Sequence, residues 1–271
     1  MKMSNTKYFA LAALAVGMFG SAHATSSWNF SSGTTATTTL LSGSADPTLA
    51  SFSGVYATNN TANSGFATTS TTWTTGTAAN LLYWSGSGVG MASDGNVSPN
   101  HAIDNSGNTE AILFNFASSV VLSSVGIGWK SGDADISLFR YIGGSAPTLS
   151  TTSATTMAGW QLVGNYADLA VDTSAPYTAV NSGNLGSSWW LLSAYNGNYG
   201  GASTSTTDPI TGLQQGNDFF KVFGVTGRAC TSTAAGVCSP SKVPEPTSLA
   251  LFGAGLLGLI GARRRRNASA V

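Results

Sequence analysis

Between residues 25 and 229 the chain consists of short runs of aromatic and β-branched residues, separated by Gly, Ser, Asn and Asp. Apolar residues do not recur at helical spacing over any window as long as a typical helix. Short runs of this composition, bounded by turn-forming residues, are typical of β-strands. The pattern therefore predicts a mainly β domain.

About ten runs are expected to form strands. These are residues 26–30, 50–57, 66–73, 81–84, 111–116, 120–129, 135–141, 160–166, 189–195 and 219–225. Turns are expected at residues 117–119 and 131–133, and loops at residues 86–90 and 196–209. Many short strands separated by turns favour two packed antiparallel sheets. We therefore predict a single antiparallel β-sandwich of jelly-roll type at residues 25–229.

The domain is large enough for one core, and it is acidic. Residues 25–243 number 219, which suits one sizeable β domain. Ten acids and five bases in this part give a net charge of −5. A nucleic-acid partner requires a basic face, so this class of partner is excluded. Binding to anionic lipid headgroups is disfavoured for the same reason.

Residues 1–24 have the three parts of a secretory signal peptide. Lys2 and Lys7 form the basic region, residues 8–19 form the apolar helix, and Ala22 and Ala24 form a small-x-small cleavage pattern. We therefore expect the secretion machinery to export the chain and signal peptidase to cut it before Thr25.

The C-terminal segment combines prolines, a short apolar stretch and a basic cluster. Pro244, Glu245 and Pro246 precede 14 residues at 249–262, and four arginines follow: Arg263, Arg264, Arg265 and Arg266. A helix of that length spans about 21 Å, less than the roughly 30 Å hydrocarbon core. We expect a short transmembrane helix that stops transfer temporarily, with the arginines on the cytoplasmic side. The alternative is an ordinary permanent anchor.

This order of Pro-Glu-Pro, apolar helix and arginines resembles the PEP-CTERM sorting signal of Gram-negative bacteria, and assigns residues 243–267 to it. The resemblance implies that an exosortase-type membrane protease cuts near Pro244-Glu245-Pro246. The domain would then reach the cell surface, the outer membrane or the extracellular matrix. Segments of the domain are also similar to exosortase-dependent surface proteins of the same bacteria, without any chemistry assigned to them: residues 101–105, 125–129, 132–135 and 188–196.

Cys230 and Cys238 are the only cysteines of the chain. Because the exported part meets an oxidising environment, a pair this close is expected to form a local disulfide. Zinc binding is the alternative, but two sulfurs without neighbouring histidines make a poor tetrahedral site. We place the disulfide in a linker at residues 230–242.

The sequence does not point to an enzyme. His101 is the only histidine left after removal of the signal peptide, and the chain contains no Gly-x-Ser-x-Gly motif. Zinc hydrolases usually need two or three histidines. A glycosidase needs two carboxylates across a cleft, and nothing pairs Glu110 with a particular aspartate. A surface hydrolase built on His101 is kept as a less favoured alternative.

Four aspartates lie in turn-like contexts that suit calcium: Asp94, Asp104, Asp133 and Asp135. The simpler interpretation is that they form hydrogen bonds to their own backbone in turns. We therefore expect no cofactor, and we keep a structural calcium ion as the alternative.

These features predict an exported structural or adhesive protein, and the family resemblance implies an association with exopolysaccharide and biofilm. A carbohydrate-binding module is the alternative, since one or two tryptophans at a rim could stack on sugar rings. Trp189 and Trp190 should face opposite sides of a strand, so only one would be in the core if one face of the sheet were solvated.

Overall fold

The computed structural model of this chain describes residues 25–30, 49–58, 72–75, 79, 81–174, 177–200, 212–214, 218–230 and 237–238. They belong to a unit that extends from Thr25 to Ser239. The predicted signal peptide and sorting segment lie outside the described residues. Among the described residues, no helix is long and apolar enough to cross a bilayer.

The strands form one eleven-stranded antiparallel sheet, which confirms the prediction of a mainly β fold. Two single-turn 3₁₀ helices, η2 (Leu149–Thr151) and η3 (Gly197–Tyr199), lie in loops. The strands are β1 (Ser26–Asn29), β2 (Leu49–Thr58), β3 (Leu81–Trp84), β4 (Gly88–Met91), β5 (Ile103–Asp104), β6 (Asn108–Lys130), β7 (Ile136–Tyr141), β8 (Trp160–Tyr166), β9 (Thr178–Ala179), β10 (Ser187–Ala194) and β11 (Phe219–Ala229).

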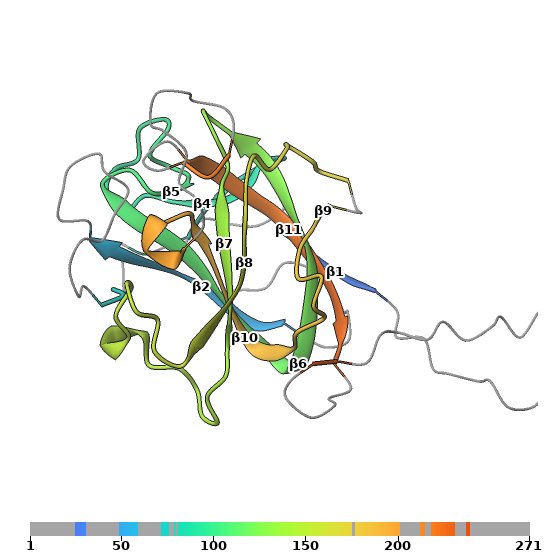
Figure 1. Ribbon diagram of the computed structural model, residues 1–271. Helices are drawn as coiled ribbons and strands as arrows, with labels where there is room; N and C mark the ends of the chain where they lie inside the picture. The colour runs from blue at the N-terminus through green and yellow to red at the C-terminus, as the bar shows by residue number, and fades with distance from the viewer. Residues whose placement is uncertain are drawn as a thin grey trace, which may run out of the picture. The chain divides into compact units, whose positions relative to one another are not determined.

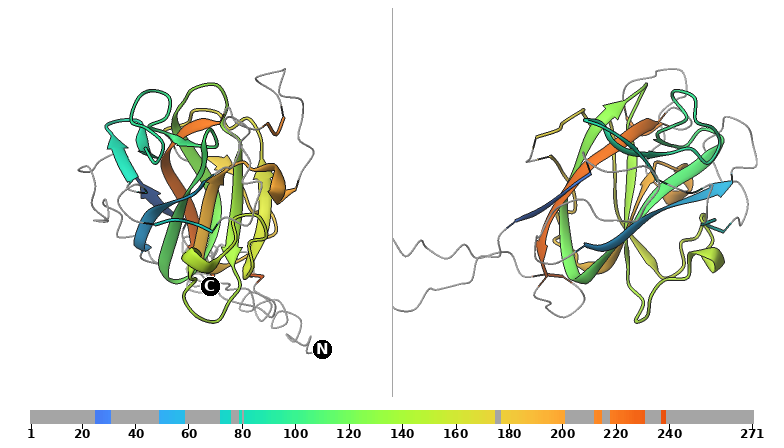
Figure 2. Two further views of the ribbon diagram at one scale, coloured as in Figure 1. Left: turned by 90° about the vertical axis from the view of Figure 1, so that its left-hand side faces the viewer. Right: turned by 180° about the vertical axis from the view of Figure 1, so that it is seen from behind.

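Strand β6 connects two parts of this sheet. Up to Phe116 it lies between β2 and β10, and the sheet continues from β10 through β7 to β8. From Val120 it lies between β9 and β11, and the other edge of β11 pairs with β5, β4 and β1. Figure 1 shows β6 bending between these parts, and Figure 2 shows β1 and β2 from behind.

The predicted turn at residues 117–119 is wrong, because β6 continues through it. Ala117 and Ser118 are exposed at the position where β6 changes its neighbours. Small and polar residues here fit a solvent-facing bend in a continuous strand, and the sequence pattern does not distinguish such a bend from a turn.

The loop predicted at residues 86–90 is also partly wrong, because β4 begins at Gly88. Gly88 and Gly90 pair with Trp84 and Leu82 of β3, and other backbone lies very close to both glycines. A Cβ atom on Gly90 would lie 3.0 Å from the Cα atom of Ala102, and one on Gly88 would lie 2.8 Å from the Cα atom of Phe223. Glycine here therefore serves close packing of the backbone.

Most of the strand predicted at residues 66–73 lies outside the described residues, and residues 72 and 74 form isolated bridges to Ser153 and Tyr56. The two-residue strands β5 and β9 were not predicted, because segments so short give no alternating pattern.

One large core takes residues from both parts of the sheet. Its largest side chains come from β1, β2, β6, β10 and β11 and from the residue after β1: Trp28, Phe30, Phe52, Phe114, Phe116, Trp190 and Phe220. Aromatic contacts link them, for example between Trp28 and Phe116, whose ring centroids are 4.8 Å apart. We refer to this set as the main core.

A second core covers the opposite face of β2, β6, β10, β7 and β8. Leu149 of η2, Met157 and Trp73 pack there against strand residues such as Phe139 and Leu191. The sheet is therefore covered on both faces in this region. As a result, Trp190 is fully buried in the main core, while its neighbour Trp189 is half-buried against the second core.

Candidate functional site

The first acidic cluster consists of Asp94, Asp104 and Glu110, which offer carboxylate oxygens within 4.8 Å of one another. Asp104 in β5 and Glu110 in β6 are both 0% exposed, whereas Asp94 is exposed. Oδ1 of Asp104 accepts a hydrogen bond from the Ser106 amide at 2.9 Å, and Oε1 of Glu110 accepts one from the Ser93 amide at 3.0 Å. The second oxygens, Oδ2 of Asp104 and Oε2 of Glu110, are buried without a hydrogen-bond partner.

The electrostatics of this cluster oppose full ionisation. Burial raises the pKa of Asp104, and the charges of Glu110, Asp94 and Asp218 raise it further. Burial also raises the pKa of Glu110, with a smaller increase from Asp94. Two buried carboxyl groups this close cannot both be ionised unless a cation compensates their charge.

The second acidic cluster consists of Asp133, Asp135 and Asp218, all of them buried. Backbone amides occupy most of its oxygens. Asp135 accepts hydrogen bonds from the amides of Asp168 and Gln214, each at 2.7 Å, and Asp218 accepts one from the Asp135 amide at 2.7 Å. Oδ2 of Asp133 is buried without a partner. This cluster therefore holds separate chain segments together by hydrogen bonds.

Asn105 connects the two clusters. It follows Asp104 directly, and its side-chain amide donates to a carboxylate oxygen of Asp218 and to the carbonyl of Tyr195, the latter at 2.9 Å. Its Oδ1 accepts a hydrogen bond from the Asp218 amide at 3.1 Å.

The structure thus divides the four aspartates that the sequence singled out between two clusters, and it adds Glu110 and Asp218. The signal for Glu110 was present, since it is the only glutamate within residues 25–243 and lies in an apolar run. The sequence marks Asp218 less clearly, because its only distinctive feature is its position directly before the apolar strand β11.

A third group surrounds the side chain of Lys221, which is 2% exposed. Its Nζ atom lies 3.7 Å from the ring centroid of Trp129 and 4.4 Å from that of Trp84. The Nδ1 atom of His101 is 2.9 Å from Nζ. The ammonium is therefore held by two cation–π contacts and by an imidazole nitrogen. We call these four residues the lysine cage.

The lysine cage places His101 against a cation. Burial lowers the pKa of His101, and the charge of Lys221 lowers it further, so the imidazole is kept neutral. A hydrolase of the Ser-His-Asp type requires the ring between a serine and a carboxylate. The contacts of His101 with Lys221, Trp84 and Trp129 differ from that arrangement.

Stability should depend on pH through Lys221. Burial lowers the pKa of its ammonium from 10.5 to about 8, so between these values the unfolded chain binds more protons than the folded one. Stability should therefore rise with pH in this window. Lys221→Met keeps the apolar stem and does not titrate. Urea denaturation from pH 7 to 10 should show wild type gaining stability relative to this variant, and parallel curves would contradict the assignment.

The seven tryptophans divide into two groups. Trp28, Trp73, Trp160 and Trp190 are buried. Trp84, Trp129 and Trp189 are half-buried, and of these the first two lie together in the lysine cage. Trp84 and Trp129 are therefore two half-buried tryptophans whose rings contact the same ammonium group.

Cys230 and Cys238 form a disulfide in the structure. The Cys238 amide donates to the carbonyl of Asn184 at 2.9 Å, and the Cys230 amide donates to that of Ser119 at 2.9 Å. The unit therefore continues beyond the expected boundary at residue 229 and includes the disulfide.

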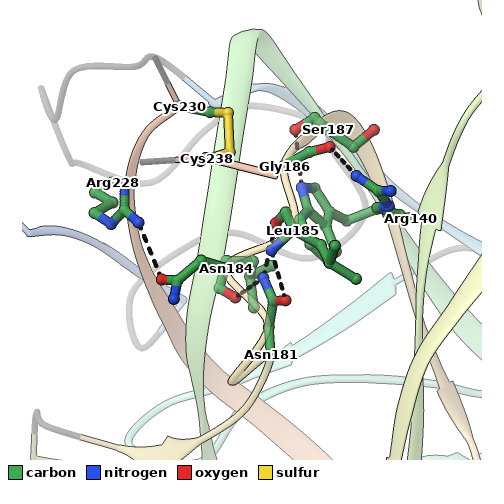
Figure 3. The surroundings of a disulfide bond; sticks show 11 residues. Arg140, Asn181, Asn184, Leu185, Gly186, Ser187, Arg228, Cys230 and Cys238 are labelled. Atoms are coloured by element: carbon green, nitrogen blue, oxygen red, sulfur yellow. Dashed lines mark hydrogen bonds between the residues drawn. A yellow bond between two sulfur atoms is a disulfide. The ribbon is translucent and has the colours of Figure 1, made fainter. Parts of the chain in front are cut away.

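The loop beneath the disulfide is held from both sides (Figure 3). Arg228 donates to the side chain of Asn184 at 3.0 Å, and Arg140 donates to the carbonyl of Gly186 at 3.0 Å. Gly186 leaves room for the sulfurs, since a Cβ atom there would lie 3.1 Å from the Cβ atom of Cys230. Cys238 is thus fixed to the domain four residues before Lys242.

The family model of the PEP-CTERM protein-sorting motif matches residues 242–266. The chain carries a PEP-CTERM protein-sorting motif. The match includes the Pro-Glu-Pro segment, the apolar stretch and the arginines, so the predicted resemblance is confirmed. The motif implies a protein that is exported, held at the membrane and then processed by exosortase.

Neither a curated protein nor a solved structure matches the chain. The residues assigned to signal cleavage, Ala22 and Ala24, lie outside the described residues, as do Pro244, Glu245, Pro246 and Arg263 to Arg266. Their individual roles stay predictions.

Proposed function

We propose that this PEP-CTERM protein is a non-catalytic structural or adhesive component of the cell surface or of the extracellular polysaccharide matrix. The sorting motif carries the proposal, because it implies export and release from a temporary membrane anchor. The domain supports it through a disulfide suited to an oxidising exterior and a net negative charge. The only histidine of this part is held by Lys221, which agrees with a role without catalysis.

We further propose that the domain is a β-sandwich of jelly-roll type. Strand β6 passes from one part of the sheet to the other, and the main core draws side chains from both parts. Such an arrangement supports two packed sheets that share a strand.

Fractionation of cells tests the location. In cells with an intact sorting protease, the domain should be recovered from the outer surface or from the matrix, and deletion of the gene should weaken cell aggregation or matrix retention. In cells without the protease it should stay with the inner membrane. A domain found in the inner membrane of both strains would reject the proposal.

Binding to polysaccharide is the second candidate function, and the adjacent half-buried rings of Trp84 and Trp129 favour it. If these rings stack on sugar, Trp129→Ala should lower affinity for the cell's own exopolysaccharide by about tenfold. Affinity electrophoresis measures this, and Trp189→Ala serves as the control because Trp189 packs elsewhere. Equal retention of both variants would exclude this surface.

A further inference from the structure

We propose that Asp94, Asp104 and Glu110 bind one calcium ion. The three residues come from the loop after β4, from β5 and from β6, so the ion would join three chain segments. The proposal goes beyond the role in the matrix and does not depend on it.

Two buried oxygens point to a ligand in the first acidic cluster. Asp104 and Glu110 are each 0% exposed, and each uses one carboxylate oxygen in a hydrogen bond to a backbone amide. The other oxygen of each, Oδ2 and Oε2, is buried without a partner. A buried carboxylate oxygen is unfavourable unless a donor or a cation satisfies it. One cation between the two residues would satisfy both oxygens at once.

The charge of the surroundings also favours a cation. The charged groups that act most strongly on Asp104 are Glu110, Asp94 and Asp218, all of them acids. A divalent ion would compensate the repulsion between these carboxylates without requiring their protonation.

The donor set fits calcium in particular. The cluster offers carboxylate oxygens and contains neither histidine nor cysteine, which zinc and other transition metals prefer. Calcium accepts six to eight oxygen ligands in irregular arrangements, and water and carbonyl oxygens can complete such a set. Magnesium requires a near-ideal octahedron and usually keeps several waters. Asp94, the third carboxylate of the cluster, is exposed to solvent.

In the second acidic cluster, most carboxylate oxygens already accept a hydrogen bond and are not available to a cation. Both oxygens of Asp135 and both of Asp218 already accept hydrogen bonds, and Oδ2 of Asp133 alone is buried without a partner. We therefore assign calcium to the first cluster only.

Thermal unfolding of the full chain in mild detergent tests the site. After treatment with EDTA, calcium at about one hundred times its dissociation constant should raise Tm by roughly 5–10 °C. The same concentration of magnesium should give a much smaller shift. Extracellular modules bind calcium with dissociation constants of about 10⁻⁴–10⁻³ M, so titration calorimetry should cover this range.

Two variants localise the ion. Glu110→Gln keeps the shape of the side chain and removes its charge, so it should abolish the calcium shift while unfolding at a higher Tm than wild type in EDTA. Asp94→Asn changes an exposed residue, leaves folding intact, and should weaken calcium binding at least tenfold. Asp172→Asn is the matched control, because its carboxylate caps Ser174 outside both clusters. It should keep the full shift.

An unchanged Tm between EDTA and calcium at that same saturating concentration would overturn the proposal, and equal shifts with both ions would overturn the choice of calcium. Undiminished calcium binding by Asp94→Asn and Glu110→Gln would place the ion elsewhere and also reject the site.

Discussion

Trp190→Ala is expected to lower the free energy of unfolding by about 3–5 kcal/mol. The indole is 0% exposed in the main core, and its Nε1 atom donates to the carbonyl of Ser187 at 2.9 Å. Truncation removes a large apolar surface, leaves a cavity in a closely packed region and deprives a buried carbonyl of its donor. The loss is comparable to the total stability of many domains.

The neighbouring residue provides the control. Trp189→Ala changes the same side chain one position away, on the opposite face of β10, where the ring is half-buried. Its cost should be smaller by at least about 1.5 kcal/mol, since less apolar surface is lost. Urea denaturation of both variants measures the difference. Equal costs would contradict the assignment of Trp190 to the main core.

Gly88→Ala is expected to destabilise the domain by about 3 kcal/mol or more, through two effects that add. The residue has a φ of 95°, which is unfavourable for alanine. A Cβ atom would also lie only 2.8 Å from the Cα atom of Phe223 in β11. Because the obstacle is backbone of the adjoining strand, β4 would have to move away from β11.

Gly86 separates these two effects. It has a φ of 75°, but a Cβ atom there would meet nothing within 4 Å. Gly86→Ala should therefore cost only about 1–2 kcal/mol, the conformational share alone. Thermal unfolding of the two variants should differ by several degrees. Equal Tm values for Gly86→Ala and Gly88→Ala would contradict the close approach between β4 and β11.

The class of fold could be predicted because the residue composition of each short segment indicates a strand without reference to distant contacts. Runs of aromatic and β-branched residues gave most strands within a few residues of their observed bounds, including β7, β8 and β10. The failures have a physical reason as well. The bend of β6 at residues 117–119 and the start of β4 at Gly88 depend on which strands lie beside them. Sequence spacing carries little information on such neighbours.

The composition of the acidic clusters depended even more on distant contacts. Asp135 and Asp218 are far apart along the chain but meet because β11 begins beside the segment that leads into β7. Glu110 belongs with Asp104 because a short loop returns the chain from β5 into β6. Turn-like contexts identified four of the six acids, and only the pairing of the strands explains how they are grouped.

The lysine cage was not predicted at all. Trp84, His101, Trp129 and Lys221 come from β3, the loop before β5, β6 and β11, and nothing in their sequence spacing connects them. In the sequence, His101 stands as an isolated candidate for catalysis. The structure gives it a neutral imidazole as partner of a buried ammonium.

The central claim is that the C-terminal segment is a disposable sorting signal, and intact-mass analysis of the protein recovered from cells tests it most directly. With the sorting protease present, the mature chain should begin at Thr25 and end near Pro244-Glu245-Pro246, without the apolar stretch or the arginines. Without the protease, the chain should retain the apolar stretch and the arginines at residues 263–266. A mature chain that retains Arg263 to Arg266 in cells with the active protease would contradict the account.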